Sequence, residues 1–205
     1  MSNFISTITE YYSKIHDIPI LYCALIALIV PFLVFVAGFL IQLLSDALGQ
    51  MVSMALAPIV SYAIINYAFF PGVMVHELSH AFMALITGAK VTEVALFKKD
   101  DASGSLGHVN FRNRGNVIAV AFQNVFISSA PMYLGGAACF GCFFSIYHLT
   151  DFPIWFKILL GYLGVAIFFH MTMSPADRKV YIKGVPIMMA IIFIIAVPLR
   201  LFGVI

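Results

Sequence analysis

The chain has 205 residues, of which 62% are hydrophobic and 10% charged, and its formal net charge is +2. An ordinary soluble domain carries about 25% charged residues, so the composition excludes a typical soluble enzyme. The small, scattered positive charge gives no support for a nucleic-acid partner. Because the apolar residues fall in long uncharged runs, we expect residues 1–205 to form a single integral domain in a lipid bilayer.

The first apolar run follows a polar segment at residues 1–17. No small-residue cleavage site comes after this run, so a removable signal peptide is not expected. Residues 18–45 carry no charge and exceed the ~20 residues needed to cross the hydrocarbon. This run predicts the first transmembrane helix.

The next run, residues 47–89, contains one carboxylate, Glu77. The run is too long for one ordinary span, and Pro58 and Pro71 are natural kink points. It predicts either an interfacial segment followed by one long bent helix, or two shorter helices. Within it, residues 69–86 are typical of a membrane helix.

Residues 90–114 are rich in charge and surround a Ser-Gly-rich turn at 101–105. The flanking segments, 91–97 and 106–111, partly alternate between apolar and polar residues. This pattern predicts a β-hairpin on the cytoplasmic side or associated with the membrane.

Three further runs are apolar enough to span: residues 115–150, 152–174 and 184–198. The first is interrupted near its middle by Ser128-Ser129-Ala130-Pro131, which predicts a broken helix. We therefore expect an all-α polytopic fold of about five transmembrane helices, with six as the alternative, and a short β-hairpin after the second apolar run.

The Lys and Arg residues concentrate in the 90–114 segment and at 178–183, whereas the connection near Asp151 has few. The positive-inside rule makes both basic segments cytoplasmic. With five spans, the amino terminus is also cytoplasmic and the carboxyl terminus lies outside.

The sequence His76-Glu77-Leu78-Ser79-His80 lies within the expected membrane helix. Residues four apart share a helical face, so His76 and His80 can bind one metal ion, with Glu77 beside them as the general base. Ionisable groups at membrane depth cost several kcal/mol unless they are paired or bound to metal. The motif therefore predicts a metal site, and Zn²⁺ is the ion that takes such nitrogens readily.

A third protein ligand must come from elsewhere in the chain. Asp100 and Asp101 fall in the expected turn, and Asp151 falls at the opposite membrane face. Asp177 remains as a candidate, although it could equally be an ordinary helix-end acid beside Arg178.

These elements together resemble the site-2 protease family of intramembrane zinc metalloproteases, over roughly residues 70–180. The resemblance rests on HExxH, the hairpin, Ser129-Ala130-Pro131 in place of the family's Ala-Gly-Pro, and Pro175-Ala176-Asp177 in place of a Pro-containing motif ending in Leu-Asp-Gly. It implies that Asp177 is the third zinc ligand, although Ala176 and Arg178 replace the family's Leu and Gly. His170, seven residues earlier on a similar helical face, is the reserve ligand.

The resemblance also implies that the substrate is a transmembrane protein whose unwound segment is held by the edge of the 91–97 strand. The alternative is that the hairpin is a plain cytoplasmic connector. Gln123 and Asn124 are polar residues within a span, and they could line the substrate path or form interhelical hydrogen bonds.

The predicted function is hydrolysis of a peptide bond in or near a transmembrane segment. The alternatives are a catalytically inactive pseudoprotease that binds membrane clients, and a metal or proton transporter. Short loops and the absence of a signal peptide suit a prokaryotic plasma membrane.

Overall fold

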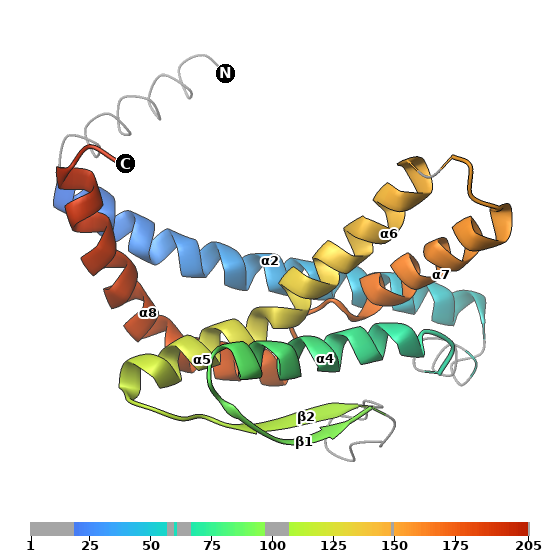
Figure 1. Cartoon of the computed structure of the whole chain (residues 1–205), viewed down its shortest axis with the longest axis horizontal. Helices are drawn as coiled ribbons and strands as arrows, with labels where there is room; N and C mark the ends of the chain where they lie inside the picture. Colours follow the sequence, from blue (N-terminus) through green and yellow to red (C-terminus); the bar gives the residue numbers. More distant parts are fainter. Residues whose placement is uncertain (1–18, 57–59, 61–66, 97–106, 149, 205) are drawn as a thin grey trace.

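The computed structural model of the chain describes residues 19–56, 60, 67–96, 107–148 and 150–204 (Figure 1). The described part is mostly helical, with one small antiparallel sheet, in agreement with the predicted fold class. The elements in chain order are α2 (Pro19–Ala55), α4 (Phe70–Ile86), β1 (Lys90–Ala95), β2 (His108–Arg112), α5 (Val117–Ala130), the π-helical turn η2 (Pro131–Gly135), α6 (Gly136–His148), α7 (Ile154–His170) and α8 (Pro175–Leu201).

Three helical segments of the described chain are long and apolar enough to cross a membrane. They are α2, the continuous segment Val117–His148, and α8, while α4 and α7 are shorter apolar helices. The described chain thus has five main helical segments, which are α2, α4, Val117–His148, α7 and α8. This number agrees with the five predicted spans, and the membrane crossings themselves stay a prediction.

The helix α2 begins close to the predicted first span but ends ten residues later, at Ala55 instead of position 45. The polar segment at 1–17 and the kink point Pro58 lie outside the described residues. The predicted helix at 69–86 is confirmed as α4.

The predicted break in the 115–150 run is confirmed at Pro131, where α5 gives way to the π-helical turn η2 before α6 continues. Proline has no N–H to donate to the carbonyl four residues before it, so the regular hydrogen-bond ladder is interrupted there. The interruption leaves the carbonyl of Ile127 without its usual intrahelical partner.

The last helix differs from the prediction, because α8 begins at Pro175 and not at position 184. Ser174 caps its amino end, and Pro175 at the first helical position needs no hydrogen-bond partner for its nitrogen. The charged segment that was expected to be a loop is thus the first two turns of α8, which places Asp177 inside a helix.

The predicted hairpin is confirmed as the pair β1 and β2, with a register shift between Val91 and Glu93. Gly88 has a positive φ of 80°, which lets the chain leave α4 and turn into β1. The predicted turn at 101–105 lies outside the described residues.

The helix α4 lies at the centre of these elements. It contacts α5, η2 and α7 on one side, and both strands of the hairpin run along it (Figure 1). The helix α8 packs against α5 and α2, and α6 packs against α7. The helix that carries the HExxH motif therefore contacts five other elements, and Glu77, Ser79 and His80 of the motif are buried.

Candidate metal centre

The two histidines of the motif lie one turn apart on α4 and turn their Nε2 atoms toward each other at 3.2 Å. Each ring also makes a hydrogen bond through Nδ1. His80 Nδ1 lies 2.7 Å from the carbonyl oxygen of Ile127, and His76 Nδ1 lies 2.6 Å from that of His170. A carbonyl oxygen can only accept, so Nδ1 carries a proton in each ring, and in the neutral rings both Nε2 atoms present lone pairs.

Both carbonyl partners are available because of local breaks in helical hydrogen bonding. The oxygen of Ile127 is free because the residue four positions on is Pro131. The oxygen of His170 is free because α7 ends there. The Ser129-Ala130-Pro131 break thus orients His80 without itself touching the metal position.

Asp177 joins the two histidines from the first turn of α8. Its Oδ1 atom lies 3.4 Å from His80 Nε2, and its Oδ2 atom lies 3.9 Å from His76 Nε2. Oδ2 also accepts hydrogen bonds from the Ser174 amide at 3.0 Å and the Ser174 hydroxyl at 2.6 Å. This capping box fixes the carboxylate, and its Oδ1 atom faces His80 Nε2.

The amino end of α8 is held in place by Arg178. Its guanidinium donates to the Met173 carbonyl oxygen at 2.8 Å and to the side-chain oxygen of Gln42 on α2. The connection ties the turn that carries Asp177 to a second long helix.

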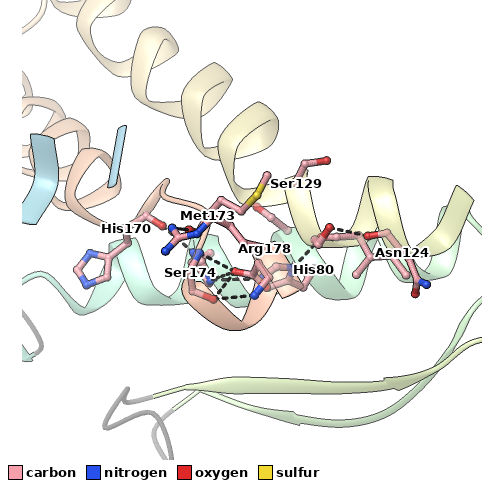
Figure 2. Close-up of polar contacts among 12 residues, drawn as sticks. His80, Asn124, Ser129, His170, Met173, Ser174 and Arg178 are labelled. Atoms are coloured by element: carbon pink, nitrogen blue, oxygen red, sulfur yellow. Dashed lines mark hydrogen bonds and ion pairs between the residues drawn. The ribbon is translucent and has the colours of Figure 1, made fainter. Parts of the chain in front are cut away.

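His170, the predicted reserve ligand, contacts the cluster through its main-chain oxygen and not through its ring. Its imidazole Nδ1 donates to the Ala166 carbonyl oxygen of its own helix at 2.9 Å, and Figure 2 shows the ring pointing away from the contacts around His80. His170 contributes its main-chain oxygen to His76, and its ring is not part of the cluster.

Glu77 lies beside the cluster, between α4 and the hairpin, and only 7% of its surface is exposed. It interacts electrostatically with His80 and Asp177. Gly107, which precedes β2, packs on its side chain so closely that a Cβ at that position would lie 2.8 Å from Glu77 Cγ. The hairpin therefore shields the carboxylate.

The donor set suits a tetrahedral ion. The three ligand atoms, one each from His76, His80 and Asp177, all lie within 4.8 Å of one another. Bonds of about 2.0–2.1 Å in tetrahedral geometry place ligand atoms roughly 3.3 Å apart, which agrees with the 3.2 and 3.4 Å separations at His80. When both rings are neutral and Asp177 is ionised, the three lone-pair-bearing atoms repel one another, and a bound cation relieves this repulsion.

Gln123 and Asn124 both form polar contacts between segments. Gln123 donates to the carbonyl oxygens of Thr87 and Arg114, at 3.1 and 2.9 Å, and so joins the end of α4 to the start of α5. Asn124 accepts from Asn113 at 2.6 Å.

The chain matches no protein-family model, no curated protein and no solved structure.

Sequence reasoning missed the carbonyls of Ile127 and His170 and the close contact at Gly107. A signal for the first was present, because Pro131 stands four residues after Ile127. The other two depend on tertiary contacts that no spacing in the sequence encodes.

Proposed function

We propose that this chain is an intramembrane zinc metalloprotease, similar to the site-2 protease family, that hydrolyses a peptide bond in or near a transmembrane segment of a membrane protein. The observation that carries the proposal is the convergence of two histidine Nε2 atoms and one carboxylate oxygen next to the buried Glu77. The long apolar helices around the centre support a location within a bilayer.

In this proposal, Zn²⁺ is held by His76 Nε2, His80 Nε2 and Asp177 Oδ1. A bound zinc ion acts as a Lewis acid and lowers the pKa of water toward about 7. The Glu77 carboxylate accepts a proton from the attacking water and returns it to the amine nitrogen as the C–N bond breaks.

The surroundings of these residues hold them ready for that chemistry. The carbonyls of Ile127 and His170 keep both imidazoles in the tautomer that leaves Nε2 free. Ser174 fixes the Asp177 carboxylate. The low exposure of Glu77 and His80, 7% and 6%, keeps bulk water away from the reacting groups.

A transporter fits these observations less well. A transport path needs polar groups distributed along several spans. In the described part of the chain, the buried carboxylate and the buried imidazole are Glu77 and His80, three residues apart on one helix.

The first experiment is the zinc content of detergent-purified protein, measured by mass spectrometry for the parent, Glu77→Gln, Asp177→Ala and His170→Ala. We expect about one zinc per chain in the parent, Glu77→Gln and His170→Ala, and loss in Asp177→Ala. The His170→Ala variant should retain zinc because the His170 ring lies outside the cluster and the substitution keeps the main-chain oxygen that contacts His76. No zinc in the parent would contradict the proposal.

The second experiment measures cleavage. The parent and Glu77→Gln are each incubated with detergent-solubilised membrane proteins, and newly formed peptide amino termini are quantified. New termini with the parent alone are the expected result. Zinc bound by both proteins without new termini from either would instead identify a pseudoprotease.

A further inference from the structure

A cleft of about 580 Å³ lies between β2 and α8. Residues 109–113 line one wall, and Asn124, Val180 and Lys183 line the other. Successive residues of a strand point to opposite faces, so a wall of consecutive strand residues follows the edge of the strand and not a face. The other edge of β2 pairs with β1, so the cleft runs along the unpaired edge.

The cleft is positively charged. Arg112 and Lys183 line it, and its lining contains no acidic residue. Neither cation forms an ion pair with another residue that the structure describes. Lys90 stands directly opposite Arg112 in the hairpin, and like charges in that position destabilise a sheet. The neighbouring acid, Glu93, accepts a hydrogen bond from Asn110 at 3.2 Å and lies 3.5 Å from His108 Nε2.

The far wall of the cleft is rigidly built. Gly184 lies where α8 crosses α5, and a Cβ there would come within 2.5 Å of the Ala121 carbonyl oxygen. This close approach holds Lys183 near Asn124, which is 8% exposed. Asn113 donates to Asn124 Oδ1, while its own Oδ1 is buried and has no hydrogen-bond partner among the described residues.

The cleft and the metal centre share helical faces. Asn124 precedes Ile127 by three residues on α5, and Val180 follows Asp177 by three residues on α8. Residues three apart lie on one face of a helix. Lys183 is six residues beyond Asp177, which is about 9 Å along the axis at ~1.5 Å per residue. An extended chain covers that distance in roughly three residues.

We propose that the cleft binds an extended peptide segment and that Arg112 and Lys183 select a carboxylate side chain about three residues from the bond at the metal centre. The strand edge fits an extended chain, and the charge fits an acidic residue. The position of the carboxylate relative to a cleaved bond rests on the proposed function, whereas the peptide preference of the cleft does not.

The test uses direct binding in the Glu77→Gln background, so that the probe is not cut. The probes are rhodamine-labelled heptapeptides of alternating valine and threonine with a central glutamate, glutamine or lysine, and binding is followed by fluorescence polarisation. We expect the glutamate peptide to bind most tightly. Lys183→Gln should lower its preference over the glutamine peptide by roughly fivefold, the size of an exposed ion pair.

Reversing the charge of Lys183 gives a more stringent test. Lys183→Glu should favour the lysine peptide over the glutamate peptide, and such a gain cannot come from misfolding. Lys157→Gln, which removes an exposed charge from α7 outside the cleft, is the matched control and should leave the preference unchanged.

Equal binding of the three peptides to the parent, or an unchanged order in Lys183→Glu, would overturn the proposal. So would a lipid result, in which phosphatidylglycerol co-purifies with the parent but not with Lys183→Gln while the peptides show no preference. The two proposals fail separately, because a glutamate preference without zinc or cleavage would leave the cleft assigned and remove the protease function.

Discussion

The buried centre on α4 and the open cleft along β2 share two helices, α5 and α8, but differ in how their polar atoms are partnered. At the centre, both histidine rings are anchored to carbonyls and the aspartate is held by Ser174. In the cleft, Arg112 and Lys183 make no ion pair with a residue that the structure describes. A preorganised centre suits a resident ion, whereas unpaired groups suit a ligand that comes and goes.

The largest expected effect is at the centre, with His80→Ala. The substitution removes one of three converging ligand atoms, so zinc should fall from about one per chain to none, as measured by mass spectrometry. Ser79→Ala is the matched control, because the Ser79 hydroxyl bonds only to the Val75 carbonyl of its own helix. Zinc retained in His80→Ala would mean that the ion binds elsewhere.

The next effect concerns the anchor of His80. Pro131→Ala restores an N–H that can bond to the Ile127 carbonyl, so His80 loses exclusive use of that oxygen. Loss of such a supporting contact costs about 10- to 100-fold in metal affinity. Titration with a zinc-chelating indicator measures this, with Pro198→Ala, in the distant end of α8, as the control. Equal affinities for the two variants would show that Pro131 does not tune the site.

The border between the two regions is tested by Gly107→Ala. The added methyl group would press on Glu77, so cleavage should slow by roughly 10- to 100-fold while zinc content stays unchanged. Gly136→Ala, where a Cβ meets nothing within 4 Å, should have no such effect. A normal cleavage rate in Gly107→Ala would show that the hairpin can yield without disturbing the base.

The smallest effect is expected for Ser174→Ala. It removes the hydrogen bond that caps the helix and one of the two hydrogen bonds from Ser174 to the Asp177 carboxylate, at a cost of about 1 kcal/mol in stability. Thermal unfolding in detergent should show a modest decrease, with zinc still bound. Ser53→Ala in α2, whose hydroxyl bonds within its own helix, is the control.

The sequence predicted the parts of this molecule that depend on local spacing. His76 and His80 follow from their separation on a helix, and the break at Pro131 follows from its missing N–H. Asp177 needed the family resemblance, because hydropathy placed it in a loop and its capping role depends on Ser174. The pairing of His76 with the His170 carbonyl joins residues 94 apart, so only the packed structure reveals it.

The cleft could also be predicted only in part from the sequence. The positive-inside rule predicts that the segments of Arg112 and Lys183 lie on the same side of a membrane. The rule could not predict that Arg112 and Lys183 line the same cleft, because their proximity depends on the close approach of α8 to α5 that Gly184 allows.

The Asp177 carboxylate belongs both to the capping box of α8 and to the candidate metal cluster. Melting of the first turn of α8 would release the carboxylate, so ion binding and local helix order share a free energy and reinforce each other. That turn leads directly to Val180 and Lys183 in the cleft wall. If the centre binds zinc and the cleft binds a peptide as proposed, we expect each ligand to tighten the binding of the other through this short stretch of helix.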